Sequence, residues 1–327
     1  MLGKLVALHV SILIIIAVLP ACNVSSDETI SMQQQPSDNT KGETKVDLSI
    51  SATNETDILA TTPLVSEWIN YVGGERVSAD HIIPYSVNTH TYNPGAKDIA
   101  KIISAQYVFA IGLQYEGPWL VKLLDSHPDI VLVTLVDFIS PLEFTRSEDS
   151  QFQDRYDPHF WFDPTLVSTV IESIAKVLSS IDPDGHSYYT EKAVEYAIEL
   201  EKLDQNIVGE ISTIPESKRK IMTEHESLGY LGNRYNIEVL KAVIPDFSSG
   251  AGPTPKDLAS AIRLIRKHDI QVIFLGNDTN GKTSQRIAEE TGIRVVTGLN
   301  VETLNPGQSY VDFIKYNINL IVSNLSD

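Results

Sequence analysis

Two blocks of short apolar runs that alternate with amphipathic segments constrain the fold of this chain more than any other feature. In the first block, runs such as "AQYVFAIG" and "DIVLVTLVDF" alternate with helical patterns such as "AKDIAKIIS". The second block repeats this order with "RKIMTEH", "TPKDLASAIRLIRKHD" and "QVIFLG". Short buried strands that alternate with helices are typical of a parallel sheet with helices on its faces. Each block therefore predicts one α/β lobe.

The segment between the two blocks has a different pattern. Asp163 and Pro164 predict the cap and the first position of one helix. Apolar residues recur at helical spacing over residues 188–211 and predict a second, longer helix. A helix of that length spans about 35 Å, enough to connect two lobes. The predicted fold class is α/β, with two lobes of parallel sheets flanked by helices and joined by one long rigid helix. The expected boundaries are residues 56–187 for the N-terminal lobe, 188–212 for the linking helix and 213–327 for the C-terminal lobe.

The first 55 residues do not contribute to either lobe in this interpretation. Residues 1–21 have one lysine and an apolar run that is too short for a stable membrane span, which indicates a signal peptide. The segment "LPAC" resembles a bacterial lipobox, which would make Cys22 the lipidated first residue of the mature protein; the alternative is an ordinary cleavable signal followed by an unrelated thiol. Residues 22–55 are rich in Ser, Thr, Asn, Asp and Gln and predict a flexible tether.

The chain is acidic, with a formal net charge of −18. A surface of this sign argues against nucleic acid and against an anionic lipid surface as partners. It is compatible with the attraction of cations.

Four polar side chains are expected at the ends of strands, where ligands bind in open parallel sheets. His90 follows "HIIP", His159 lies in "YDPHFWFDP", His225 follows "KIMTE", and Glu302 follows "IRVV". Three imidazoles and one carboxylate can form a complete set of ligands for a borderline divalent cation. No local motif joins these distant positions, so the residues alone leave their convergence open. The other histidines have no partner pattern and are interpreted as structural.

At these residues the chain resembles the metal-binding solute-binding proteins of bacterial ABC importers, the zinc and manganese cluster known as A-I. That family carries a first histidine in "P-G-x-D-P-H-x-Y-x-P", similar to "PYSVNTHTYNP" here, and a second in "D-P-H-x-W-x-D-P", matched by "DPHFWFDP". Its third ligand precedes a "G-Y" helix, as in "TEHESLGYLGNRY", and its fourth is a carboxylate after the last strand, as in "TGLNVETL". The resemblance implies His90, His159, His225 and Glu302 as metal ligands between two lobes, with Phe160 and Trp161 packed beneath His159.

The chain departs from this pattern at three places. Asn88 and Thr89 replace the Asp-Pro before the first ligand, Gly276 stands where relatives often have Glu, and "EFTRSEDSQFQDRYD" lacks the histidines of many zinc-handling members. Three histidines and one carboxylate favour Zn2+, and relatives selective for manganese more often have Glu as the third ligand, so Mn2+ is the alternative.

The function that the resemblance implies is capture of a divalent metal outside the cytoplasm and its delivery to an ABC transporter permease. The protein would be a monomer, anchored to the membrane through a lipid on Cys22, and not an enzyme. One alternative is a secreted zinc hydrolase with Glu224 as the base. Another is an adhesin-like surface protein in which the ion is only structural.

Overall fold

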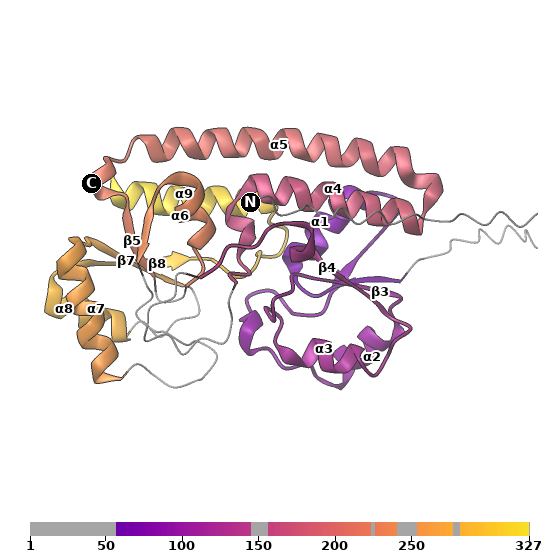
Figure 1. Cartoon of the computed structure of the whole chain (residues 1–327), viewed down its shortest axis with the longest axis horizontal. Helices are drawn as coiled ribbons and strands as arrows, with labels where there is room; N and C mark the ends of the chain where they lie inside the picture. The colour runs from indigo at the N-terminus through magenta and orange to yellow at the C-terminus, as the bar shows by residue number, and fades with distance from the viewer. Residues whose placement is uncertain (1–56, 145–155, 224–225, 241–253, 277–281, 327) are drawn as a thin grey trace, which may run out of the picture. The chain divides into compact units, whose positions relative to one another are not determined.

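The computed structural model describes residues 57–144, 156–223, 226–240, 254–276 and 282–326, which all belong to one structural unit, Thr53–Asp327. Within these residues the strands form two sheets of four, and every strand pair is parallel. The predicted fold class, two α/β lobes with parallel sheets and one long helix, is confirmed (Figure 1).

The N-terminal lobe contains the first sheet, with strand order β2-β1-β3-β4. Its strands are β1 (Ile58–Ala60), β2 (Asp80–His81), β3 (Tyr107–Ala110) and β4 (Val131–Thr134). Its helices are α1 (Pro63–Gly73), α2 (Ala96–Ser104) and α3 (Pro118–Leu124). Because all neighbouring strands are parallel, the carboxyl ends of all four strands lie at one edge of the sheet.

The C-terminal lobe repeats this arrangement with strand order β6-β5-β7-β8. Its strands are β5 (Lys220–Thr223), β6 (Glu238–Leu240), β7 (Val272–Gly276) and β8 (Arg294–Leu299). Its helices are α6 (Gly229–Tyr235), α7 (Pro255–His268), α8 (Lys282–Thr291) and α9 (Tyr310–Leu325).

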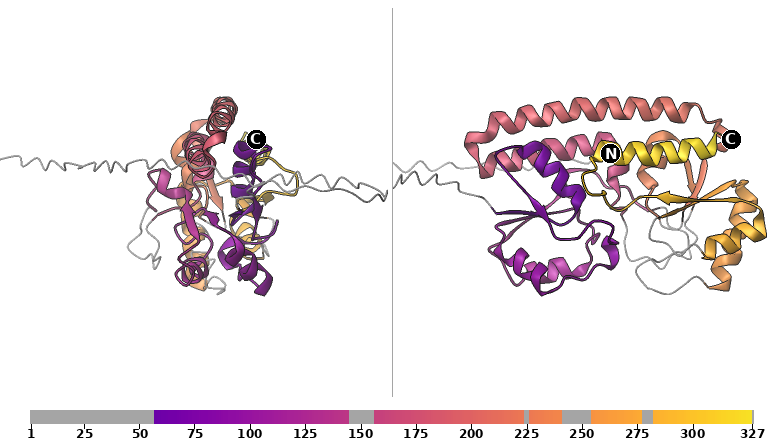
Figure 2. Two further views of the ribbon diagram at one scale, coloured as in Figure 1. Left: turned by 90° about the vertical axis from the view of Figure 1, so that its right-hand side faces the viewer. Right: turned by 180° about the vertical axis from the view of Figure 1, so that it is seen from behind.

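Two long helices, α4 (Pro164–Ile181) and α5 (His186–Ser212), connect the two sheets in the sequence. They pack side by side (Figures 1 and 2). The 27 residues of α5 span about 40 Å. This helix packs against α1 and α4 as well as against α6 and α9. Near its end, Asp204 accepts hydrogen bonds from Arg234 (2.6 Å) and Tyr235 (2.8 Å) of α6, so α5 is fixed to elements of both lobes.

One hydrophobic core is shared by the two lobes. The indole ring of Trp68 in α1 lies 5.8 Å from the ring of Phe160 and 5.7 Å from that of Tyr310 in α9, measured between centroids. All three side chains are fully buried. The same cluster includes residues of α4 and α5, so burial of apolar surface holds the lobes together.

Helix α4 is long and apolar enough, by length and composition alone, to cross a membrane. Its apolar residues instead pack into the shared core, where Val167, Val170, Ile171 and Ile174 are fully buried. Asp163 caps this helix by accepting a hydrogen bond from the Thr165 N–H (2.9 Å) ahead of Pro164, as the sequence predicts.

Two strands differ from expectation. The run "VSADHIIP" predicts a strand over residues 77–84, but β2, an edge strand bonded to β1 alone, has only two paired residues. Strand β6 is an edge strand too, bonded only to β5, and the sequence pattern does not predict it. Three residues give too short a run to show the alternation that marks a strand.

We expect Asn317→Ala in α9 to lower the free energy of unfolding by about 2–3 kcal/mol. The buried Asn317 amide accepts a hydrogen bond from the Asn300 N–H (2.9 Å) and donates one to the Asn300 carbonyl oxygen (2.7 Å). Its loss leaves both backbone groups without these bonds. Denaturant unfolding measures the change, and Ser323→Ala on the exposed side of the same helix should change stability by less than about 0.5 kcal/mol. Equal effects of the two substitutions would contradict this account.

Candidate metal centre

Three of the four predicted site residues converge in the structure. One nitrogen each of His90 and His159 and one carboxylate oxygen of Glu302 all lie within 4.8 Å of one another. His159 is fully buried, Glu302 is nearly so, and His90 is partly exposed. His90 and His159 come from the N-terminal lobe and Glu302 from the C-terminal lobe, so the group joins residues more than 140 positions apart.

His90 lies in a single 3-10 turn, Thr89–Thr91. Asn88 caps this turn, because its side-chain oxygen accepts a hydrogen bond from the Thr91 N–H at 3.3 Å. Thr89 is buried beneath the turn. The residues that depart from the family pattern therefore form a local support for His90.

His159 is oriented by a carboxylate two residues before it. Asp157 Oδ1 accepts hydrogen bonds from the His159 N–H (2.9 Å) and from His159 Nδ1 (2.7 Å). This places the proton of the neutral ring on Nδ1 and leaves the lone pair of Nε2 for a ligand. Nε2 lies 3.9 Å from Glu302 Oε1.

The loop that carries His159 is attached to the C-terminal lobe by Tyr230 of α6. The Tyr230 hydroxyl donates to the Asp157 carbonyl oxygen (2.9 Å) and accepts from the Leu142 N–H (2.8 Å). Trp161 follows in the same loop; its ring centroid is 5.1 Å from that of His159, in an edge-on arrangement. Phe160 and Trp161 are both fully buried, which agrees with the packing role expected for them.

Charge controls the protonation of His159. Burial has the largest effect on its pKa and lowers it, but the carboxylates of Asp157 and Glu302 together outweigh burial, so the pKa is raised above its ordinary value. The two carboxylates therefore stabilise the protonated form of the His159 imidazole relative to burial alone.

Glu302 follows β8 by three residues and is held by a tyrosine of the other lobe. The buried Tyr115 hydroxyl donates to Glu302 Oε2 (2.9 Å) and to the Glu302 carbonyl oxygen (3.0 Å). Oε2 also lies 3.9 Å from His90 Nε2. The Tyr115 ring packs edge-on against both His90 (4.9 Å) and His159 (5.7 Å), centroid to centroid. Burial, with the charge of Glu302, raises the pKa of Tyr115 far above its ordinary value, so its hydroxyl keeps its proton.

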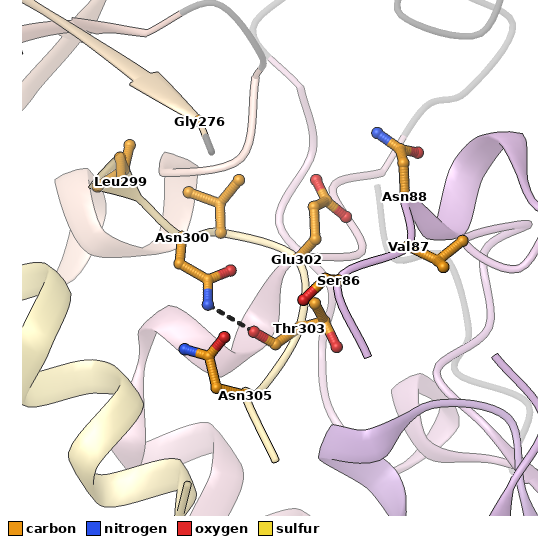
Figure 3. A pocket seen from close by; sticks show the side chains of 10 residues that line it. Ser86, Val87, Asn88, Gly276, Leu299, Asn300, Glu302, Thr303 and Asn305 are labelled. Atoms are coloured by element: carbon orange, nitrogen blue, oxygen red, sulfur yellow. Dashed lines mark hydrogen bonds between the residues drawn. The ribbon is translucent and has the colours of Figure 1, made fainter. Parts of the chain in front are cut away.

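Beside Glu302 lies a cavity of about 150 Å³, large enough for several water molecules (Figure 3). Residues 86–88 contribute to one side and residues 299–305 to the other, with Gly276 at the end of β7. The lining residues are Ser86, Val87, Asn88, Gly276, Leu299, Asn300, Val301, Glu302, Thr303 and Asn305. Among these described residues, Glu302 alone has an ionisable side chain, so the cavity opens onto the carboxylate.

This geometry suits one divalent ion. Zinc bonds to nitrogen and oxygen are about 2.0–2.2 Å long, so two ligand atoms of one ion lie at most about 4.3 Å apart. Each imidazole meets that limit with a different oxygen of Glu302, since His90 Nε2 lies 3.9 Å from Oε2 and His159 Nε2 lies 3.9 Å from Oε1. His225, the fourth predicted ligand, and Glu224, the base of the hydrolase alternative, lie outside the described residues. The ligand role of His225 stays a prediction.

Two residues of the centre were not predicted. Asp157 is part of the motif "DPHFWFDP", but its contact with the imidazole depends on a tight backbone turn that spacing does not reveal. Tyr115 lies in "IGLQYEGP", a stretch without a ligand-type pattern. The one sequence feature that could have drawn attention to Tyr115 is its neighbour Glu116, a carboxylate in the loop that follows a buried strand.

Comparison with known proteins identifies the family. The family model described as "Zinc-uptake complex component A periplasmic" matches residues 58–324. The manganese-binding lipoprotein MntA of Halalkalibacterium halodurans is 25% identical over 273 residues, which cover 82% of this chain and 88% of MntA.

Two solved structures share the fold. The Mn-bound periplasmic metal-binding protein of Candidatus Liberibacter asiaticus has a TM-score of 0.72 at 23% identity, covering 82% of this chain and 98% of that one. The periplasmic zinc-binding protein TroA of Treponema pallidum has a TM-score of 0.73 at 19% identity, covering 83% and 99%.

The orientation of His159 can be tested in the metal-free protein. Asp157→Asn removes the charge that opposes the effect of burial, so the pKa of His159 should fall. NMR of the imidazole nitrogens across a pH series measures this pKa, and the signals that disappear in His159→Gln assign the ring. Asp137→Asn, at an exposed position of the same lobe, should leave the His159 titration unchanged. An identical titration in Asp157→Asn and wild type would rule out the proposed role of the Asp157 charge.

Proposed function

Because the chain belongs to the family of zinc-uptake complex component A proteins, we propose that it captures a divalent transition metal for an ABC importer. It binds the ion outside the cytoplasm and delivers it to a permease in the membrane. The convergence of His90, His159 and Glu302 from two lobes is the single observation that carries this proposal. His225 supplies the fourth donor and completes a set of three imidazoles and one carboxylate.

Zinc is the metal that this donor set favours. Imidazole nitrogen is a preferred ligand of zinc, whereas manganese, a harder cation, is bound better where carboxylate and water oxygens dominate. The Asp157–His159 contact strengthens this preference, because a carboxylate on Nδ1 raises the basicity of the ligating nitrogen. Manganese is the second candidate, since solved structures described as Mn-bound and as zinc-binding share the fold.

The prediction that the chain is not an enzyme is confirmed by its family, whose members are binding components of uptake systems. The hydrolase alternative is thereby withdrawn. The adhesin-like alternative differs in one measurable property, because an ion with a structural role stays bound when a chelator is added, whereas transported cargo exchanges.

The predicted extracytoplasmic localisation agrees with the family description and with the lipoprotein names of its relatives. The same names support Cys22 as the site of lipid attachment. Residues 22–55 then form the tether that separates the metal-binding unit from the membrane. The protein acts as a monomer that docks on the permease.

The proposal predicts one exchangeable zinc ion per chain, displaced by chelator, with manganese bound more weakly. Elemental analysis of protein purified without chelator, followed by competition titration of both metals, measures these properties. His159→Ala should weaken zinc binding by at least about tenfold, because it removes one of the four proposed metal ligands.

His127→Ala is the matched control for this substitution. His127 bonds to the Leu123 carbonyl oxygen after α3 and precedes β4, so it lies at the edge of the sheet opposite to the site. Its replacement should leave the affinity unchanged. If His159→Ala binds both metals as tightly as wild type does, the assigned centre is wrong. If wild type retains its zinc in excess chelator, the adhesin-like alternative is favoured instead.

A second substitution tests the anchor. Wild-type full-length protein should sediment with membranes after expression in bacteria, whereas Cys22→Ser should be found in the soluble fraction, since residues 22–55 contain no long apolar run to hold it there. Fractionation and immunoblotting measure the distribution. Equal membrane association of the two proteins would refute lipidation at Cys22.

A further inference from the structure

The loop between β3 and α3 carries Tyr115 to the metal centre in an unusual backbone conformation. Gly112 (φ 99°), Leu113 (φ 53°) and Gln114 (φ 59°) are consecutive residues with positive φ, and Gly117 (φ 84°) follows. Residues with a Cβ rarely adopt this region, so Leu113 and Gln114 are strained unless the surroundings hold them there. Something in the structure must therefore hold this loop.

Glu116 provides that restraint. Its side chain is almost fully buried at 2% exposure. Its Oε1 accepts hydrogen bonds from the Thr61 hydroxyl (2.8 Å) and the Ile111 N–H (2.7 Å), and its Oε2 accepts one from the Gly112 N–H (3.3 Å). Thr61 follows β1 and Ile111 follows β3, so the carboxylate ties the loop to the ends of two neighbouring strands.

A carboxylate suits these partners better than an amide. All three contacts are donors, and an ionised carboxylate accepts at both oxygens, whereas an amide would present an N–H group to one of them. Burial raises the pKa of Glu116, and the hydrogen bonds from Thr61, Ile111 and Gly112 oppose that effect. The chain thus retains a costly buried acid directly beside the residue that contacts Glu302.

We propose that Glu116 is a positioning residue for the metal centre: it fixes the loop of residues 111–117 so that the Tyr115 hydroxyl holds the Glu302 carboxylate in its binding orientation. With Oε2 held by Tyr115, Glu302 directs Oε1 toward His159 before any ion arrives. This inference rests on the proposed metal-binding function. It differs from a purely structural role because the influence of Glu116 reaches the other lobe through one hydroxyl group.

A double-mutant cycle tests whether Glu116 acts through Tyr115. Zinc affinities are measured by chelator competition for full-length wild type, Glu116→Gln, Tyr115→Phe and the double variant. Each single substitution should weaken binding by about tenfold, as for other groups that orient metal ligands. The double variant should bind no more weakly than Tyr115→Phe, because Glu116 has nothing left to position. Fully additive losses would overturn the proposal.

Asp98→Asn is the matched control, because Asp98 also accepts hydrogen bonds from a backbone N–H, that of Gly95 (2.8 Å), and from a hydroxyl, that of Tyr92 (2.7 Å), in the same lobe. It should leave zinc affinity unchanged. If Glu116→Gln does not fold, Thr61→Val removes one of the three donors and keeps the carboxylate. Thr61→Val should also weaken zinc binding, by less than Glu116→Gln, and should have no further effect when it is combined with Tyr115→Phe.

Hydrogen exchange of the metal-free proteins separates this proposal from the metal-binding function. Glu116→Gln should speed amide exchange at residues 111–117 and also at residues 299–305, which carry Glu302. Faster exchange at residues 111–117 alone would overturn the positioning role. Failure of wild type to bind zinc or manganese would instead refute the proposed function, while the exchange result would still decide whether Glu116 controls the Glu302 segment.

Discussion

The hydrogen bond from the Trp161 indole N–H to the Val301 carbonyl oxygen, 3.1 Å long, is the contact on which the metal centre depends. Trp161 lies two residues after His159, and Val301 lies one residue before Glu302, so this bond joins the segments that carry proposed ligands from different lobes. The Tyr310 hydroxyl donates to the Trp161 carbonyl oxygen at 2.8 Å and fixes the same turn to α9. Both bonds are buried, and breaking them during separation of the lobes would leave polar groups without partners.

The sequence predicts the fold well where its signals are redundant. Helix α4 shows a cap at Asp163, a proline at its first position and apolar residues at helical spacing, and all three agree. The ends of α5 are predicted to within two residues because twenty-seven residues give many periods to count. Strands β2 and β6 lack such redundant signals, because two and three residues are too few to show an alternating pattern.

The site, too, contains residues that the sequence predicts and residues that it does not. His90, His159 and Glu302 are residue types that bind metals, and the resemblance to the family implies them as ligands in advance of any structure. Tyr115 is not predicted, because no sequence pattern distinguishes a tyrosine in this loop from a tyrosine of the hydrophobic core. Its role arises from left-handed backbone at Leu113 and Gln114, a property that the structure shows and spacing does not.

The electrostatics of the proposed centre favour a cation of high charge. His159 lies between the carboxylates of Asp157 and Glu302, and both raise its pKa against the opposing effect of burial. A raised pKa means that protons compete more strongly with an arriving ion for this ring. One proton balances only one of the two carboxylates, whereas a divalent cation balances both. Because buried charges interact strongly, this difference favours the metal, and competition from protons grows as the solution becomes more acidic.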